Sequence, residues 1–363
     1  MNAKPSHRFT IGFVLFWGLI AIILPSEGFA QSLPKVISIG CPSVGTAMHG
    51  QALAIAQFIS ERTPMQARIE PGEFLVGVDL LRKGEVEFNV NPMATVTMAI
   101  MGWAPFDKPQ WGPQSIRTVW MGSPVASMTP CVLGNSEILK YPDLKGKKIP
   151  SVLTSPALDR MTDAWLEYGG LTRKDVITVK FADSQKAYDA ILERTVDMTI
   201  CPPGSPSAYK IAASPFGIRY LGCPHKDKRY WEIMRKHAPW CVPLVIYNGA
   251  GGISKENPLE SSAMHCAMIA SAETKEEIVY NVVKALDTGN EKLVTLHKDL
   301  QGWSLSRATD LQMLKETIFV YHPGAIKYFK EMGKWTSAHD GWRNEMLALE
   351  AKRMAEFKAK QKK

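Results

Sequence analysis

The sequence predicts an α/β protein made of two units, each a mainly parallel sheet flanked by helices, with a helical C-terminal extension. Short apolar strands alternate with amphipathic helices along most of the chain, the pattern of parallel sheets covered on both faces. The length of 363 residues suits about two domains. A content of 45% hydrophobic and 21% charged residues excludes disorder, collagen and coiled coil for the chain as a whole.

The first unit opens with an apolar strand, followed by a helix whose apolar residues Ala52, Ile55 and Ile59 recur at helical spacing. A second helix over residues 75–83 ends at Gly84, a residue typical of the position just past a helix. Pro92 opens the next helix, because proline is tolerated in a first turn. The strands expected here span residues 35–39, 67–70 and 86–90.

The second unit starts near residue 130 and repeats the alternation. Leu158, Met161 and Trp165 mark the apolar face of one helix, and Ser184 is expected to cap another. The strands expected in this unit and directly after it span residues 130–133, 147–149, 176–181, 198–201, 218–222 and 244–247.

The last third of the chain is predicted to be mainly helical. Thr274 and Glu277 have the spacing of a capping box and introduce an apolar helical face. Further helices are expected over residues 311–318, after Pro323 and from about Trp342. We interpret the second unit, roughly residues 130–242, as an insertion in the first.

The predicted domains are therefore residues 31–129 plus 243–363 for the first lobe and 130–242 for the second. Two crossings join such lobes, and we place them in the proline-bearing stretches 122–130 and 238–243. Two lobes joined in this way leave a cleft between them, and closure of the cleft on a ligand is a known hinge motion.

The first 30 residues have the pattern of an export signal. Lys4 and Arg8 give a positive start, residues 9–24 form an apolar run, and Gly28 and Ala30 are small residues suited to cleavage after Ala30. A retained membrane anchor is the alternative, but the run is shorter than the roughly 20 residues that span a bilayer. We therefore expect a mature protein in the periplasm.

Charge and cysteine content narrow the class of protein further. Lys and Arg outnumber Asp and Glu by 43 to 35, a mild excess without the dense basic stripes of nucleic-acid binding. None of the six cysteines lies in a Cys-x-x-Cys pair, which argues against zinc-ribbon and thioredoxin sites. Export permits disulfides, and both bridges and buried free thiols remain open.

No enzyme motif is evident in the sequence. A phosphate-binding P-loop, His-Glu-x-x-His, Gly-x-Ser-x-Gly and Gly-x-Gly-x-x-Gly are all missing, and Asp, Glu and His do not cluster as metal ligands would. We therefore assign no catalytic residue, no cofactor and no metal.

Four strand-to-helix loops carry small polar residues instead. Such loops lie at the carboxyl ends of parallel strands, where open α/β sheets bind ligands and helix N-termini favour anions. The ligand-binding residues predicted from them are Thr46, Ala47, Met48, His49, Asn91, Met93, Thr154, Ser155, Pro156, Pro203, Gly204 and Ser205.

Residues 321–333, Tyr-His-Pro-Gly-Ala-Ile-Lys-Tyr-Phe-Lys-Glu-Met-Gly, resemble the C-terminal segment of the TAXI family of TRAP-transporter solute receptors. Residues 143–147, Val279-Tyr280 and Gly45-Thr46 are also similar to segments of that family. The resemblance implies a two-lobe, type II-like periplasmic binding protein fold. It also implies a TRAP membrane permease of fused subunits as partner, and a small organic anion such as glutamate or 2-oxoglutarate as ligand.

The binding loops depart most from the family pattern. Met48-His49 stand near the place of two aromatic residues, and residues 151–156 contain no glycine. His322, although part of the similar segment, is interpreted as a structural cap or packing residue. An alternative reading is the binding protein of an ATP-driven importer for a sulfonate or a pyrimidine precursor. A third is an exported enzyme or a sensor partner.

Overall fold

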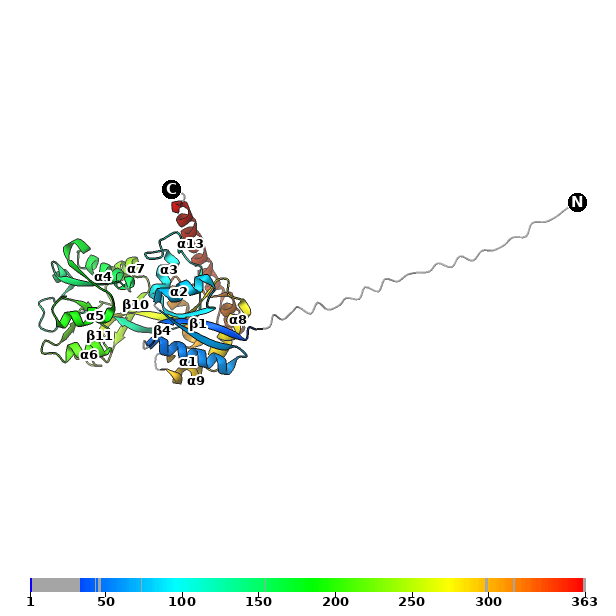
Figure 1. Cartoon of the computed structure of the whole chain (residues 1–363), viewed down its shortest axis with the longest axis horizontal. Helices are drawn as coiled ribbons and strands as arrows, with labels where there is room; N and C mark the ends of the chain where they lie inside the picture. The colour runs from blue at the N-terminus through cyan, green and yellow to red at the C-terminus, as the bar shows by residue number, and fades with distance from the viewer. Residues whose placement is uncertain are drawn as a thin grey trace. The chain divides into compact units, whose positions relative to one another are not determined.

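The computed structural model describes Met1 and residues 33–42, 44, 47–72, 74–153, 155–297, 300–315 and 317–361. Residues Leu33–Lys363 form one compact unit. The predicted signal peptide and its cleavage site lie outside the described residues. Figure 1 traces the chain from the blue strand β1 to the red helix α13.

The larger sheet contains three parallel strands, β1 (Val36–Pro42), β2 (Gln66–Gly72) and β3 (Phe88–Pro92). Val36 pairs with Gln66 and Pro42 pairs with Gly72, so β1 and β2 end level with each other. The parallel pairing expected for the first unit is confirmed for these strands.

Three antiparallel strands complete this sheet, in the order β10-β11-β3-β1-β2 with β4 on β11. Strand β11 (Leu259–Ser271) pairs on one edge with β4 (Ile116–Met128). On its other edge β11 pairs first with β10 (Cys241–Ile246) and then with β3. In Figure 1 these long strands run between α1 and the green helices α5 and α6.

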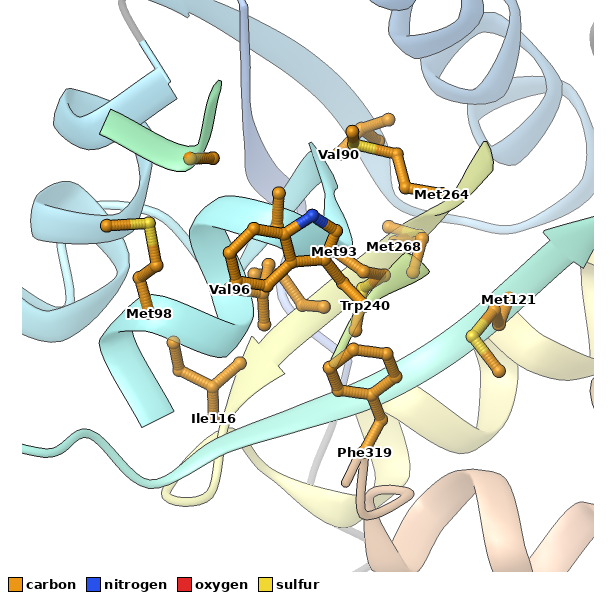
Figure 2. Packing of buried hydrophobic residues seen from close by; sticks show 14 of the residues in the cluster. Val90, Met93, Val96, Met98, Ile116, Met121, Trp240, Met264, Met268 and Phe319 are labelled. Atoms are coloured by element: carbon orange, nitrogen blue, oxygen red, sulfur yellow. The ribbon is translucent and has the colours of Figure 1, made fainter. Parts of the chain in front are cut away.

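Helices α1 (Ala47–Arg62), α2 (Phe74–Lys83) and α3 (Met93–Met101) each follow one parallel strand. Helix α2 ends at Gly84 as predicted, and the φ of +71° there is one that glycine adopts without strain. Helix α3 lies in the core, where its residues pack around Trp240 together with Met264, Met268 and Phe319 (Figure 2).

The segment after β4 contains a second set of strands. β6 (Lys148–Val152) and β7 (Ile177–Phe181) pair in parallel. β5 (Pro130–Leu133) pairs antiparallel with both β8 (Thr199–Ile200) and β9 (Ile218–Tyr220). The α/β class is confirmed, but the sheets are mixed, and the parallel pairing predicted here holds only for β6 and β7. The helices are α4 (Pro156–Tyr168), α5 (Ser184–Leu192), α6 (Pro206–Ala212) and α7 (Lys228–His237), with 3₁₀ turns at Tyr141–Leu144 and Arg173–Asp175.

The C-terminal third is helical, as predicted. Its helices are α8 (Glu276–Thr288), α9 (Asn290–Leu296), α10 (Leu305–Ala308), α11 (Leu311–Lys315), α12 (Pro323–Glu331) and α13 (Ser337–Gln361).

Two predicted caps are wrong by one residue. Lys275, not Thr274, precedes α8 as its N-cap, and no side chain caps that helix. Asp183 caps α5 by accepting from the backbone N–H of Lys186 at 2.9 Å, so Ser184 is already inside the helix. In both cases the sequence offers two adjacent candidates, and the backbone conformation decides between them.

His322 has the structural role predicted for it. Its Nδ1 accepts a hydrogen bond from the backbone N–H of Gly324 at 3.1 Å, which caps α12. The side chain is 1% exposed, and burial lowers the pKa of its imidazole to about 4. A neutral ring is the form that can accept this bond.

Candidate functional site

Three helices begin just after the carboxyl ends of the parallel strands of the larger sheet. Helix α1 starts five residues after Pro42, α2 two residues after Gly72, and α3 directly after Pro92. Each helix start presents backbone N–H groups without helical partners and the positive end of the helix dipole. This edge of the sheet is therefore suited to hold an anion.

Two buried asparagines of β3 connect the end of this strand to the start of α2. The amide nitrogen of Asn91 donates to the carbonyl of Phe74 at 3.1 Å and to Oδ1 of Asn89 at 2.9 Å. The side-chain oxygen of Asn91 is buried and has no hydrogen-bond partner among the described residues. Asn91, predicted as a ligand contact, thus ties the start of α2 to the end of β3 and keeps one acceptor unused.

The first and second predicted loops are brought together through β11. The thiol of Cys266 lies 3.9 Å from the sulfur of Met48, and Cys266 pairs with Pro92 in the sheet. His49 is half-buried in the first turn of α1. Ala47 begins that helix, whereas Thr46 lies outside the described residues.

Met93 occupies a different environment from the one predicted. It is fully buried beside Trp240 in the core, where Figure 2 shows the two side chains close together. A methionine in the first turn of a helix is compatible with a ligand-facing wall and with a core position, and packing around Trp240 selects the core.

The third predicted loop precedes α4. Ser155 is its half-buried N-cap residue, but the hydroxyl makes no capping hydrogen bond, and Pro156 is the first helical residue. Thr154 lies outside the described residues. Nearby, the hydroxyl of Ser151 donates to Asp159 at 2.8 Å, and desolvation raises the pKa of that carboxyl group.

In the fourth predicted loop, polar groups of Ser205 and Pro203 already make hydrogen bonds within the fold. Ser205 accepts from the backbone N–H of Ala208 at 3.2 Å and so caps α6. The carbonyl of buried Pro203 accepts from the backbone N–H of Ala250 at 2.9 Å, while Gly204 is exposed. The hydrogen bonds of Ser205 run to its own segment, as do those of Ser155 to Val152 and Leu158.

Two apolar residues in these loops were missed by the sequence reasoning. Val44 in the first loop is 73% exposed, and Leu153 in the third is 64% exposed. Single exposed apolar side chains are common on protein surfaces, so these two are candidate contacts only because they lie beside the helix starts. In the sequence, Val44 follows Ser43 and precedes Gly45, whereas Leu153 follows Val152 and precedes Thr154.

A cavity of about 250 Å³ between α7 and β10 was also missed. It is lined by Cys241, whose thiol is buried, and by His225, Lys228, Trp231, Arg235, Val242 and Pro243. Lys228, Trp231 and Arg235 in this lining are three and four residues apart along α7, whereas His225 precedes the helix.

Catalytic groupings do not emerge from the described residues. Within them, no group of three or more His, Cys, Asp or Glu side chains is arranged to hold a metal ion. No helix within the described ranges is long and apolar enough to span a membrane. What the candidate site offers among the described residues is backbone N–H groups at helix starts, a buried amide oxygen, a serine hydroxyl and exposed apolar side chains.

These features define an α/β protein that presents helix N-termini, not reactive side chains, at the edge of its sheet. The chain belongs to the NMT1-like family, whose model matches residues 39–333. This family match does not confirm the resemblance to the TAXI receptors. No curated protein matches the chain.

Several solved structures resemble the chain at low identity. The periplasmic aliphatic sulphonate binding protein SsuA from Escherichia coli is 16% identical, with 91% of this chain and 88% of that chain covered and a TM-score of 0.47. A sulfonate-binding SsuA from Methylobacillus flagellatus is 14% identical, with 83% and 95% covered and a TM-score of 0.49. The probable amino-acid ABC transporter extracellular-binding protein ytmK from Bacillus subtilis is 14% identical, with 73% and 95% covered and a TM-score of 0.42.

Proposed function

We propose that the protein is an extracytoplasmic solute-binding protein that captures a small organic anion and delivers it to a membrane importer. The observation that carries this proposal is the gathering of the starts of α1, α2 and α3 beside the ends of β1, β2 and β3. The unused oxygen of Asn91 adds an acceptor for an ammonium, amide or hydroxyl group of the same solute.

We propose that the cleft lies between two lobes, for which the sequence predicts residues 31–129 plus 243–363 and residues 130–242. The 13-residue strands β4 and β11 support this division, since they are the long connections between the two sets of strands. Cys131, Ile191 and Ile211 form a second, smaller core cluster. Ala250 packs in that cluster too, so we place the return to the first lobe in β11 rather than before residue 243.

The first and third loops supply the apolar walls of the proposed site. Val44 and Leu153 each expose most of their surface, and burying them against a ligand would gain roughly 25 cal/mol for each Å² covered. Thr46, Thr154 and Ser155 would add hydroxyl groups. The combination favours a solute with one anionic group and an apolar body, such as a sulfonate or an organic acid.

The membrane partner we propose is an ATP-driven importer, and the class of solute is a sulfonate, an amino acid or a pyrimidine precursor. Membership in the NMT1-like family supports this reading over the TRAP-type receptor. The structurally similar proteins include sulfonate- and amino-acid-binding proteins, which agrees with this reading.

A TRAP permease remains the second candidate, on the resemblance of residues 321–333 to TAXI receptors. In the structure Tyr321 and His322 are buried, and the segment builds α12. The residues that carry the resemblance are therefore packing residues, and the ligand and the permease are identified by the experiments below. In either case we propose that residues 1–30 direct the chain to the periplasm and are removed after Ala30.

A thermal-shift panel tests the proposed function. The full-length exported protein is heated with sulfonates, amino acids, dicarboxylates and pyrimidine precursors, each far above a micromolar dissociation constant. A binder at 100 times its dissociation constant stabilises the fold by about 2.7 kcal/mol. We expect one chemical class to raise the melting temperature. A uniform lack of shift, together with turnover of any of these compounds, would contradict a binding protein.

Transport in reconstituted vesicles separates the two importers. Uptake of the identified solute that requires ATP supports the first candidate, and uptake that requires an ion gradient without ATP supports the second.

A further inference from the structure

The cavity between α7 and β10 is separate from the helix starts of the candidate site. In the described part of the chain, none of its lining residues belongs to the four predicted loops. One wall is a face of α7, and the other is β10, the outermost strand of the larger sheet. Its volume of about 250 Å³ lies just below the roughly 300–1,000 Å³ of pockets for drug-sized ligands, so it suits a smaller solute.

Two cationic side chains of α7 line this cavity. Lys228 and Arg235 are seven residues apart, which places them on one face of the helix, two turns from each other. Neither side chain forms an ion pair with another described residue. The lining contains no described Asp or Glu, and Glu260 beside it already accepts from the backbone N–H of His225 at 3.0 Å. The cavity therefore carries positive charge that suits an anionic ligand.

Trp231 forms the aromatic part of the same wall. It lies three residues after Lys228 and four before Arg235, and is therefore between them on that face. The side chain is 6% exposed, and its indole N–H is buried without a hydrogen-bond partner among the described residues. The ring of His225 packs against it with centroids 5.9 Å apart, and Nε2 of His225 donates to the carbonyl of Ser261 at 2.9 Å. The indole is thus held in place with one donor unused, and an acceptor atom of a ligand would satisfy that donor.

We propose that this cavity binds a small aromatic acid, one ring with a carboxylate or sulfonate group, at a second site apart from the proposed cleft. The anionic group accepts charged hydrogen bonds from the guanidinium of Arg235 and the ammonium of Lys228. The ring of the acid packs against the indole of Trp231, since aromatic pairs attract each other in offset and edge-to-face arrangements. Val242 and Pro243 of β10 supply the apolar wall on the other side.

Titration calorimetry of the full-length protein with three probes tests the charge and ring requirements. Benzoate and benzenesulfonate carry the ring and an anionic group, whereas benzyl alcohol carries the ring alone. We expect saturable binding of at least one of the two acids, and binding of benzyl alcohol at least about tenfold weaker, because the alcohol cannot pair with the cations. Benzyl alcohol bound as tightly as the acids, or no binding of either acid at about 10 mM, would overturn the proposal.

Variants locate the bound acid. Lys228→Ala/Arg235→Ala should weaken binding of the acid at least about tenfold, and both positions are exposed, so the fold should be kept. Lys358→Ala/Lys360→Ala removes the same charge from exposed positions of α13 and is the matched control, which should leave the affinity unchanged. An equal loss of affinity in the two double variants, or no loss in the first, would overturn the site on α7.

A variant of the third predicted loop separates this site from the proposed cleft. Thr154→Ala/Ser155→Ala should bind the aromatic acid as the wild type does, because neither residue lines the cavity. Loss of the acid in this variant, with retention in Lys228→Ala/Arg235→Ala, would mean that the acid binds in the cleft. That outcome would overturn the second site and leave the proposed function standing. A protein that binds the acid on α7 but no solute in the cleft would refute the proposed function alone.

Discussion

The guanidinium carbon of Arg160 lies over the indole of Trp103, 3.6 Å from the ring centroid. Arg160 is on α4 and Trp103 follows α3, so this contact joins the two sets of elements that we propose as lobes. Arg160 also donates through Nε to the carbonyl of His237 at 2.7 Å. Trp103 in turn makes an edge-to-face contact with Trp240, with centroids 6.5 Å apart.

Arg160→Ala should lower the free energy of unfolding by about 2 kcal/mol, since it removes a cation–π contact and a charged hydrogen bond. Urea denaturation monitored by tryptophan fluorescence measures this. Arg160→Lys keeps the charge but lacks the planar group, and it should recover only part of the loss. An Arg160→Ala protein as stable as the wild type would show that the contact contributes nothing.

Glu350→Gln should destabilise the protein by about 3 kcal/mol, because it leaves a buried guanidinium without its counter-charge. Glu350 on α13 bonds to Arg117 at 2.9 Å and to Ser115 at 2.7 Å, and both charged side chains are about one-tenth exposed. Glu345→Gln, at an exposed position of the same helix, is the control and should change stability little. Similar unfolding midpoints for the two variants in guanidinium would refute this role for the pair.

Gly77→Ala should cost about 1–3 kcal/mol although alanine favours helix. A Cβ at Gly77 would lie 2.2 Å from the amide nitrogen of Asn89, which is fully buried. Gly341→Ala in α13 is the matched control, since nothing lies within 4 Å of its Cβ, and it should stabilise by about 0.5–1 kcal/mol. Thermal melts compare the two variants. A higher melting temperature for both would mean that the Asn89 side chain moves aside at little cost in free energy.

Stability should fall in acid in part because of His322. Its pKa is about 4 in the folded protein and near 6.5 in an unfolded chain, so the unfolded state binds more protons between these values. The contribution is complete above pH 6.5, decreases as the pH falls towards 4, and amounts to about 3 kcal/mol.

His322→Asn keeps a good helix cap but cannot titrate. Its unfolding free energy, measured by urea at a series of pH values, should vary less between pH 4 and 6.5 than that of the wild type. His265, whose pKa burial also lowers, acts in the same direction and remains in the variant. Identical pH profiles would exclude His322 as a source of acid sensitivity.

Much of the fold was predictable because strands and helices alternate and because characteristic residues mark their ends. Strand β5 has the predicted bounds, Gly84 ends α2, and His322 caps α12. In each case local chemistry, such as a glycine at positive φ or a side-chain acceptor, determines the outcome.

The long strand β11 was not predicted. Its sequence contains Ser261, Ser262, His265 and Met268 without alternation, because almost every residue is buried. A strand covered on both faces loses the two-residue period that identifies strands. The buried hydroxyls are satisfied by partners distant in sequence, such as Ser127 for Ser261 at 2.7 Å.

The candidate site was predictable in kind but not residue by residue. Strand ends and helix starts follow from the alternation of elements. Tertiary packing decides whether Met93 faces a ligand or Trp240. It also decides whether Ser205 caps α6 or stays available for a ligand, and the local sequence specifies neither outcome.

Titration calorimetry on the exported protein tests the central claim most directly. The solute identified in the thermal-shift panel should bind with one-to-one stoichiometry. The Thr154→Ala/Ser155→Ala variant should bind it at least about tenfold more weakly, a loss of about 1.4 kcal/mol. Ser306→Ala, an exposed serine elsewhere, should leave the affinity unchanged. An equal dissociation constant for the double variant and the wild type would contradict a ligand-binding role of the third loop, residues 151–156.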